Sequence, residues 1–335
     1  MSERPTPRRT AKPKVAVTRH LMPSIEARMA ELFDATFNEA DSPLTRDELA
    51  DRMRTADVLV PTVTDRIDAA LIAEAGPQLG LIASFGAGID HIDLAAARAK
   101  KIIVTNTPGV FTDDTADLTM ALIIGVPRRL REGTALIRRG EWSGWAPSTL
   151  LGRKLGGKVL GIVGMGRIGQ AVAWRARAFG LTIRYHNRHR LPQAVESMFG
   201  AEYVDNLDVL LREADIVTLH APATEATRGL LNADRIAAMK PGATIVNTAR
   251  ADLIDYEAMI AALESGHLGG AGLDVYPEEP TVDARLVAMP NVIAQPHIGS
   301  ATIEGREASG EKVIANIRFW ADGHRPPDQV LEGLV

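Results

Sequence analysis

Three short polar segments carry residue types suited to acid–base chemistry on a small anionic substrate. They are NTAR at 247–250, DVYPEEP at 274–280 and QPHIG at 295–299. Each lies at the end of a short apolar run that predicts a strand, and open α/β sheets bind their ligands outside the carboxyl ends of the strands. Taken singly, the arginine, the acid and the histidine have ordinary structural explanations. Together they are expected to meet in one crevice.

A glycine-rich segment, GMGRIG at 164–169, lies between a predicted strand at 158–163 and a predicted helix at 170–179. This context makes the G-x-G-x-x-G spacing a specific signal. The glycines permit a tight turn, close approach of a pyrophosphate and close helix–strand packing. The start of the helix offers unpaired N–H groups to the phosphates. The segment therefore predicts a dinucleotide site.

The end of the next strand bears on which dinucleotide is bound. An NAD site usually has Asp or Glu about 20 residues beyond the glycines, but residues 185–190 are YHNRHR, without a carboxylate. Neutral Asn187 would not repel a 2′-phosphate, and Arg188 and Arg190 can pair with one. This turn favours NADP, with NAD as a possible cofactor; the alternative is a solvated basic turn.

The elements that position these residues are short apolar runs separated by amphipathic stretches. The predicted strands are at 15–17, 58–60, 81–84, 102–105, 159–163, 182–185, 216–219, 244–246, 272–275 and 292–294. Strands buried on both faces and separated by helices indicate parallel sheets. We predict an α/β protein with two open, doubly wound parallel-sheet domains, a flavodoxin-like substrate domain and a Rossmann dinucleotide-binding domain, with an active-site cleft between them.

Two long helical patterns predict the joins between the domains. One covers 112–139 and contains Pro127, which predicts a kink or break there; the other covers 303–320. A long helix at each end of one group of predicted strands indicates a domain inserted into another. We therefore predict a substrate domain at 15–110 plus 298–335, a dinucleotide-binding domain at 111–297, and a flexible basic tail at 1–14.

Composition excludes several other classes of protein. With 335 residues, two domains are expected, and 46% hydrophobic and 24% charged residues are ordinary for a globular protein. The lack of cysteine excludes disulfides and cysteine-ligated metal sites, and we expect no metal. A net charge of −4 gives no attraction to nucleic acid or anionic membrane. No apolar run predicts a membrane span or signal peptide, so we expect a cytoplasmic protein.

The motifs, taken together, resemble the D-isomer-specific 2-hydroxyacid dehydrogenase family, most closely its glyoxylate and hydroxypyruvate reductases. The resemblance rests on SFGAGIDH at 84–91, the glycine loop at 164–169, NTAR at 247–250, DVYPEEP at 274–280 and PHIGS at 296–300. It extends over roughly residues 55–325, and order, spacing and predicted strand context all agree. It implies hydride transfer from NAD(P)H to a small 2-oxoacid, giving the D-2-hydroxyacid.

The resemblance also implies roles for individual residues. Arg250 would bind the substrate carboxylate and carbonyl, His297 would be the general acid or base, and Glu279 would hydrogen-bond His297. The backbone of Ala87 and Gly88 would hold the substrate carboxylate. A charged histidine suits proton donation, and a neighbouring carboxylate stabilises that form. Cofactor contacts are assigned to Gly164, Met165, Gly166, Arg167, Ile168, Gly169, Asn187, Arg188, Arg190, Pro222, Thr227, Thr248, Ala249, Asp274 at the nicotinamide end, and Gly299.

Several alternatives stay open at this point. Ala251 departs from the family, which usually has Gly after the arginine. Glu278 is a second candidate partner for the histidine, and His220 and His267 are expected to be bystanders. A formate dehydrogenase of the same fold would pair its histidine with a glutamine, for which Gln295 is the candidate. A dinucleotide-sensing corepressor on the same scaffold is the non-enzymatic alternative.

Subunit assembly and substrate preference are predicted from the resemblance to the reductases. In similar reductases, the segment matching EWSGW at 141–145 belongs to an arm that crosses to a partner subunit, and a tryptophan matching Trp145 reaches the partner's active site. Large aromatic residues are favoured anchors at interfaces, so Trp142 and Trp145 predict a homodimer. Among small 2-oxoacids, we expect glyoxylate and hydroxypyruvate to be preferred and pyruvate to be a weak substrate.

Overall fold

The computed structural model describes residues 11–331, which form two compact units. The first unit contains the described residues up to Phe111 and from Ala301 onward, and the second contains Thr112–Ser300. Residues 1–10 of the predicted tail lie outside the described residues. Lys14, the last residue of that predicted tail, instead begins a strand, where it pairs with Asp34 of the neighbouring strand and its backbone N–H donates to Asp57 Oδ2 (2.9 Å).

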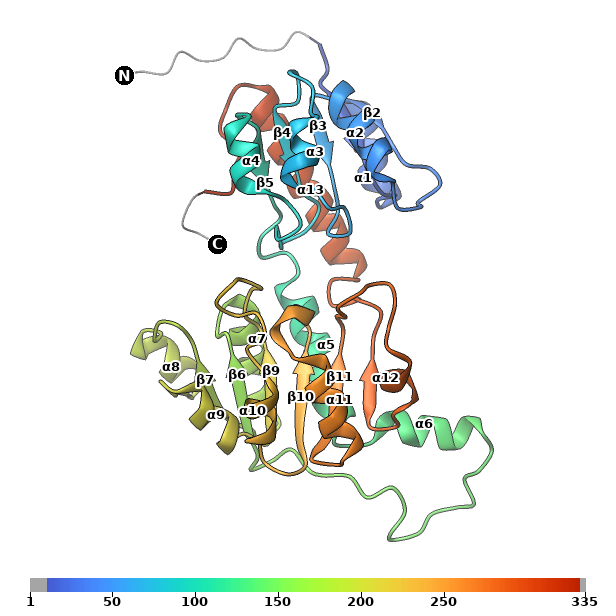
Figure 1. Ribbon diagram of the computed structural model, residues 1–335, viewed down its shortest axis with the longest axis vertical. Coiled ribbons are helices and arrows are strands. Elements are labelled where there is room, and N and C mark those ends of the chain that lie inside the picture. The colour runs from blue at the N-terminus through green and yellow to red at the C-terminus, as the bar shows by residue number, and fades with distance from the viewer. Residues whose placement is uncertain (1–10, 332–335) are drawn as a thin grey trace. The chain divides into compact units, whose positions relative to one another are not determined.

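The first unit has a five-stranded parallel sheet (Figure 1) with the order β2-β1-β3-β4-β5. This is the flavodoxin-like order. Its strands are β1 (Lys14–Val17), β2 (Asp34–Thr36), β3 (Val58–Val60), β4 (Leu81–Ala83) and β5 (Ile103–Thr105). Its helices are α1 (Pro23–Leu32), α2 (Arg46–Thr55), α3 (Ala69–Ala73), α4 (Leu94–Ala99) and α13 (Ile303–Ala321).

The second unit has a seven-stranded parallel sheet with the order β12-β11-β10-β9-β6-β7-β8 (Figure 1). Its strands are β6 (Val159–Val163), β7 (Thr182–His186), β8 (Ala201–Tyr203), β9 (Ile216–Leu219), β10 (Ala243–Asn247), β11 (Leu268–Leu273) and β12 (Val292–Ala294). Its helices are α5 (Thr112–Gly125), α6 (Leu130–Arg138), α7 (Arg167–Ala178), α8 (Gln193–Phe199), α9 (Leu207–Glu213), α10 (Ala233–Ala237), the 3₁₀ helix η1 (Ala251–Leu253), α11 (Tyr256–Glu264) and α12 (Ala284–Ala288).

Strand order in the second unit fixes where a ligand can bind. From β6 the chain first builds outward through β7 to β8, then returns to the other side of β6 with β9 and continues to β12. The order reverses at the β6–β9 pair, and doubly wound sheets bind dinucleotides at this switch point. Two parallel-sheet α/β domains, one with the Rossmann order, confirm the predicted fold class.

Helices cover both faces of each sheet and bury apolar side chains against them. In the first unit, Ile25 of α1 and Ile314 of α13 belong to one core cluster, and Met53 of α2 and Leu71 of α3 belong to the other. In the second unit, α5 and α7 pack on one face, and α9 to α12 supply the other. The sheets are therefore buried layers, which explains their continuous apolar strand sequences.

The long helical pattern at 112–139 is interrupted as predicted. Helix α5 ends at Gly125 and α6 begins at Leu130, with Pro127 between them. Pro127 lacks the N–H that would continue the helical hydrogen bonds. Its carbonyl instead accepts the backbone N–H of Arg153 at 2.8 Å, which ties the break to the segment leading into β6.

Among residues 11–331, no helix combines the length and apolarity needed to cross a bilayer.

Candidate active site

The glycine loop connects β6 to α7 at the switch point. Gly164 has a φ of +96°, and a Cβ there would lie 2.6 Å from the backbone of His220, so the turn accepts only glycine. A Cβ on Gly169 would lie 2.3 Å from the Gly164 carbonyl oxygen, which lets the first turn of α7 sit directly on the loop. The loop therefore packs closely against α7 and against the residue that follows β9.

Gly166 has a different explanation. A Cβ added there would meet no described atom within 4 Å, so packing within the protein does not require glycine. In the G-x-G-x-x-G pattern, the second glycine lets the backbone approach a pyrophosphate closely. Gly166 is the N-cap of α7, and no side chain within residues 11–331 caps this end, which leaves first-turn N–H groups for an anion. These residues fit the pyrophosphate of a dinucleotide.

The residues that follow β7 differ in their hydrogen-bond partners. Asn187 accepts the backbone N–H of Met165 through Oδ1 at 2.6 Å, which couples this turn to the glycine loop. Arg190 makes two hydrogen bonds of 2.9 and 2.8 Å to Glu196. Arg188 is exposed and makes no hydrogen bond or ion pair with any residue that the structure describes. Of the two predicted arginines, only Arg188 has its guanidinium free for a phosphate.

Glu196 is almost fully buried, at 6% exposure. The Arg190 guanidinium first, and the hydroxyl of Tyr185 second (2.7 Å), hold the pKa of the Glu196 carboxyl at about 2, well below its usual value. Arg190 also lies over the Tyr203 ring, 5.7 Å from its centroid. These contacts give Arg190 a structural role.

After β11, Asp274 fixes the turn that carries His297. Its two carboxylate oxygens accept the backbone N–H groups of Ile298 (2.8 Å) and Gly299 (2.7 Å). A Cβ on Gly299 would lie 2.9 Å from Asp274 Oδ2, so glycine is needed there. Asp274 is 1% exposed, and this burial raises the pKa of its carboxyl despite both N–H donors. His297 itself has a φ of +54°, which is uncommon for a non-glycine residue.

His297 and Glu279 lie in direct contact. Nδ1 of His297 is 2.7 Å from Oε2 of Glu279, and the Tyr276 backbone N–H donates to Oε1 at 3.0 Å. Burial acts to raise the pKa of Glu279, but His297, the Tyr276 N–H and the charge of Arg250 together lower it. Glu279 is therefore an anion that accepts from Nδ1–H, and Nε2 of His297 is left for a substrate.

The other candidate partners of His297 lie elsewhere. The structure gives Glu278 a backbone contact only, from the Thr281 N–H to its carbonyl at 2.7 Å. Gln295 also bonds through its backbone, donating to the Leu273 carbonyl and accepting from the Tyr276 hydroxyl. Of the three side chains considered from sequence, the structure places Glu279 against His297.

Arg250 follows β10 in a turn organised by Asn247, which is fully buried. The Asn247 side chain accepts the Ala249 N–H (3.0 Å) and donates to the Arg250 carbonyl (2.8 Å). Arg250 donates to the Ala249 carbonyl at 2.8 Å, and its charge lowers the pKa of Glu279. Ala251 is not among the described residues with a positive φ, so the departure from glycine is accommodated.

The remaining cofactor candidates have supporting contacts. Thr248 shares a hydrogen bond of 2.8 Å with Thr119 of α5. The hydroxyl of Thr227 donates to the Pro222 carbonyl at 2.6 Å and closes the loop after β9. The bystanders also have protein partners: His220 contacts Thr218 (2.9 Å), His267 contacts the Ile236 carbonyl (3.1 Å), and burial lowers the pKa of His220 to about 3.

In the first unit, Ala87 and Gly88 follow β4. Neither backbone N–H donates a hydrogen bond to a described residue. The Asn106 side chain holds the segment by donating to the Ala87 carbonyl at 2.7 Å, and the Thr107 N–H donates to the Gly86 carbonyl at 2.9 Å. Two adjacent free N–H groups on an anchored segment are suited to a carboxylate.

Sequence reasoning missed residues whose side chains hydrogen-bond the backbone of the candidate site residues. Thr115 of α5 donates to the Gly299 carbonyl at 3.0 Å, and Asn106 supports Ala87. These residues act on backbone groups of segments remote in sequence. No motif in a single sequence reveals such pairs.

Comparison with known proteins identifies the class. The family profile described as "D-isomer specific 2-hydroxyacid dehydrogenase, NAD binding domain" matches residues 120–299. A glyoxylate reductase of Thermococcus litoralis is 45% identical over 330 residues, covering 97% of this chain and 98% of that protein. A dinucleotide-binding fold with this profile defines an NAD(P)-dependent oxidoreductase. The chain belongs to the D-isomer-specific 2-hydroxyacid dehydrogenase family, which confirms the resemblance inferred from the motifs.

Solved structures agree with this assignment. A glyoxylate reductase from Paecilomyes thermophila superposes with a TM-score of 0.86 at 33% identity, covering 97% of this chain and 99% of that one. An NADPH-dependent glyoxylate/hydroxypyruvate reductase from Sinorhizobium meliloti, in complex with NADP and malonate, has a TM-score of 0.86 at 31% identity, with 96% and 98% covered. The likeness therefore covers both units.

Proposed function

We propose that this protein reduces glyoxylate to glycolate, which has no stereocentre, and hydroxypyruvate to the corresponding D-2-hydroxyacid. The observation that carries the proposal is the His297–Glu279 pair beside the charge of Arg250, in the same unit as a glycine loop suited to a dinucleotide. The glyoxylate reductases among its relatives support the substrate class. A bound reduced nicotinamide supplies the hydride for the carbonyl carbon.

Each proposed catalytic residue has a separate task. The Arg250 guanidinium binds the substrate carboxylate and polarises the carbonyl, because its planar fork matches an oxyanion. Nε2 of His297 donates a proton to the carbonyl oxygen as it becomes a hydroxyl. Glu279 stabilises the imidazolium and orients the ring through Nδ1. The free N–H groups of Ala87 and Gly88 are proposed to hold the substrate carboxylate.

The test is a steady-state assay of glyoxylate, hydroxypyruvate, pyruvate and other 2-oxoacids, each with NADPH and with NADH. We expect kcat/KM to be highest for glyoxylate and hydroxypyruvate and low for pyruvate. Formate oxidation is not favoured, since Glu279 and not Gln295 contacts His297. Turnover of formate without reduction of any 2-oxoacid would contradict the proposal, and absence of any turnover would restore the corepressor alternative.

We propose NADP as the preferred cofactor, with NAD as a weaker alternative. Asn187 places no negative charge at the end of β7, and Arg188 has a free guanidinium there. Arg190 contributes to the positive potential although its guanidinium is bound to Glu196. The same assays test this preference by the ratio of kcat/KM for NADPH to that for NADH.

A homodimer is proposed from the exposed apolar side chains of α6 and the segment after it. No residue of α6 is buried, and the exposed fractions include 57% for Ile137, 55% for Trp142 and 84% for Trp145. An apolar helix face beside two exposed tryptophans is costly to leave in water. A second copy of this chain is the proposed occupant.

The roles of the two units and the cellular location are also proposals. The first unit, predicted at 15–110 plus 298–335, is proposed to be the substrate domain, and the second unit, predicted at 111–297, is proposed to be the dinucleotide-binding domain. Expression of residues 112–300 alone, followed by a cofactor-binding measurement, would test the role of the second unit. The predicted cytoplasmic location would be tested by fractionation of the source cells.

A further inference from the structure

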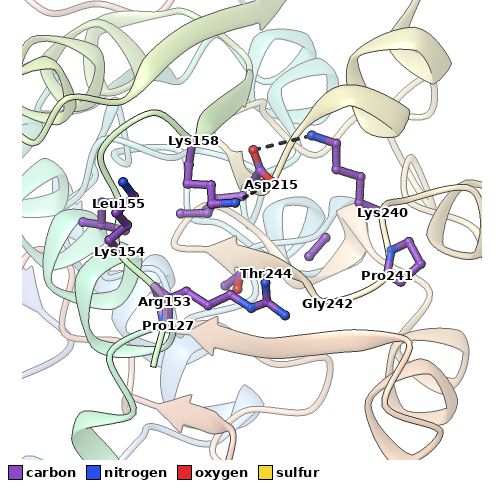
Figure 2. Close-up of a pocket in the computed structure, with 12 residues that line it drawn as sticks. Pro127, Arg153, Lys154, Leu155, Lys158, Asp215, Lys240, Pro241, Gly242 and Thr244 are labelled. Atoms are coloured by element: carbon purple, nitrogen blue, oxygen red, sulfur yellow. Dashed lines mark ion pairs between the residues drawn. The ribbon is translucent and has the colours of Figure 1, made fainter. Parts of the chain in front are cut away.

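A small pocket opens where β6, β9 and β10 begin, at the amino-terminal edge of the second unit's sheet (Figure 2). It contains about 400 Å³ of space, part of it open to solvent. The glycine loop lies at the other end of β6, and five residues at about 3.3 Å each separate the two by roughly 16 Å. The pocket is therefore distinct from the candidate active site.

Positive charge dominates the lining of this pocket. The charged residues are Arg153, Lys154, Lys158, Lys240 and a single carboxylate, Asp215. Asp215 accepts the Val159 N–H through Oδ2 at 2.9 Å, which joins the start of β6 to the start of β9. One carboxylate already bonded to the backbone leaves most of the positive charge uncompensated.

The two lysines keep donors available. Lys158 Nζ is 3.6 Å from Asp215 Oδ1, and Lys240 Nζ is 3.5 Å from Oδ2. These distances are longer than a normal N–H···O hydrogen bond, and each ammonium carries three donors. Figure 2 shows Asp215 between them, so the lysines are brought together without being saturated.

Arg153 completes the arrangement from the third side. Its backbone N–H is anchored on the Pro127 carbonyl at 2.8 Å, at the break between α5 and α6. Its side chain extends toward Gly242 (Figure 2), with Nη2 3.5 Å from where a Cβ of Gly242 would stand. The guanidinium has no hydrogen bond or ion pair to any described residue, so its donor fork is available to the pocket.

We propose that this pocket binds a phosphate dianion, either free inorganic phosphate or the phosphate of a small phosphomonoester. A guanidinium fork and two ammonium groups match the oxygens of a tetrahedral oxyanion. A dianion also neutralises more of the excess positive charge than a monocarboxylate such as a 2-oxoacid would.

The test measures binding by thermal unfolding and calorimetry. The holoenzyme, saturated with reduced nicotinamide dinucleotide so that the glycine loop is occupied, is titrated with inorganic phosphate or with glycerol 3-phosphate. Ionic strength is held constant with chloride. A ligand that binds only the folded state raises Tm, so we expect a saturable rise. The probe with the lower Kd identifies the source of the phosphate.

Substitutions of the pocket cations and of the pocket carboxylate are expected to change the Kd in opposite directions. Arg153→Gln should raise the Kd about tenfold, equivalent to ~1.4 kcal/mol, and Lys240→Gln should act in the same direction. Asp215→Asn should lower the Kd, because it removes the repelling charge but keeps an oxygen for the Val159 N–H. Arg318→Gln, at an exposed cation of α13 in the first unit, is the matched control and should leave the Kd unchanged.

The proposal is overturned if neither probe produces a saturable rise in Tm. It is equally overturned if Arg153→Gln and Lys240→Gln both bind phosphate as the parent protein and the Arg318→Gln control do. A rise in Kd for either pocket variant alone, with the control unchanged, supports it.

Discussion

Nδ1 of His297 lies 2.7 Å from Oε2 of Glu279, while the second carboxylate oxygen of Glu279 accepts the Tyr276 N–H. Both oxygens of the carboxylate are thus fixed, one by the imidazole and one by the backbone. The imidazole is held in a single orientation with Nε2 facing away from its partner. A rigid acid–base pair of this kind is suited to delivering a proton at a defined position.

Glu279→Gln removes the negative charge at nearly constant volume. Because the carboxylate stabilises the imidazolium needed for proton donation, the alkaline limb of kcat/KM for glyoxylate reduction should move to lower pH. The Kd for the reduced cofactor should stay nearly unchanged. The pH profile of the variant enzyme is the measurement.

Glu278→Gln is the matched control, since the Glu278 side chain makes no hydrogen bond to His297 and its loss should leave the pH profile unchanged. The assignment of Glu279 fails if the control shifts the profile and Glu279→Gln does not. His297→Ala should lower kcat by about 10²–10⁴-fold, the span expected for a lost general acid.

Arg188→Ala tests cofactor preference. If the free guanidinium of Arg188 pairs with a 2′-phosphate, its loss should reduce kcat/KM for NADPH by about one to two orders of magnitude. A charge-assisted hydrogen bond contributes about 1.5–3 kcal/mol, and ~1.4 kcal/mol corresponds to tenfold. The value for NADH should hardly change. Equal use of both cofactors by the unmutated enzyme would remove the basis for this role.

Much of the fold was predictable because buried parallel strands are continuous apolar runs, as at 159–163 and 216–219. The edge strands β2 and β8 escaped prediction, since only one side of each is paired and their sequences, DAT and AEY, are polar. Strand β11 was predicted at 272–275 but covers Leu268–Leu273. Its glycines obscured the strand pattern. A Cβ on Gly272 would lie 2.8 Å from Leu122 of α5, and one on Gly270 would lie 2.5 Å from the Asn291 carbonyl oxygen, so both positions are closely packed.

The candidate site was predictable to the extent that its residues lie in motifs. Pattern alone could not separate Glu279 from Glu278, because the choice depends on the path of the backbone between Asp274 and Pro280. Nor could it separate Arg188 from Arg190, since the partner of Arg190 is a buried Glu196 in the following helix. Choosing between such neighbouring side chains requires knowing which partner each one contacts in the folded chain.

Acid stability should depend on Arg190. The folded state holds the pKa of Glu196 at about 2, whereas the unfolded chain takes up that proton near the usual value of 4.5. Between these values the unfolded state binds more protons, so the contribution is full above about pH 5 and is lost as the pH falls toward 2. Arg190→Gln should therefore raise the midpoint pH of acid unfolding.

The measurement is circular dichroism against pH, with Arg188→Gln as the control because its guanidinium has no described partner. An unchanged acid midpoint in Arg190→Gln would show that the Arg190–Glu196 pair does not contribute to stability. This outcome would be independent of the cofactor assays.

Gly299→Ala should impair catalysis by moving the turn that carries His297. The added Cβ would lie 2.9 Å from Asp274 Oδ2 and 3.5 Å from Thr115 Cγ2, both buried, so the backbone must shift. Overpacking costs about 1–3 kcal/mol, and we expect kcat to fall at least tenfold. Gly156→Ala is the control, since its nearest contact is an ordinary 3.7 Å. Equal kcat values in the two variants would contradict the role of this turn.

The subunit contact can be tested at the exposed apolar face of α6. Ile137→Asp should convert the proposed homodimer into a monomer, because a charge would be buried without a partner at the interface. The measurement is the mass at micromolar concentration by light scattering, before and after the change. Trp174 of α7, 60% exposed in the same unit, supplies the matched control. If Trp174→Asp separates the subunits and Ile137→Asp does not, the interface lies on α7. A monomeric mass for the unmutated protein would refute the homodimer.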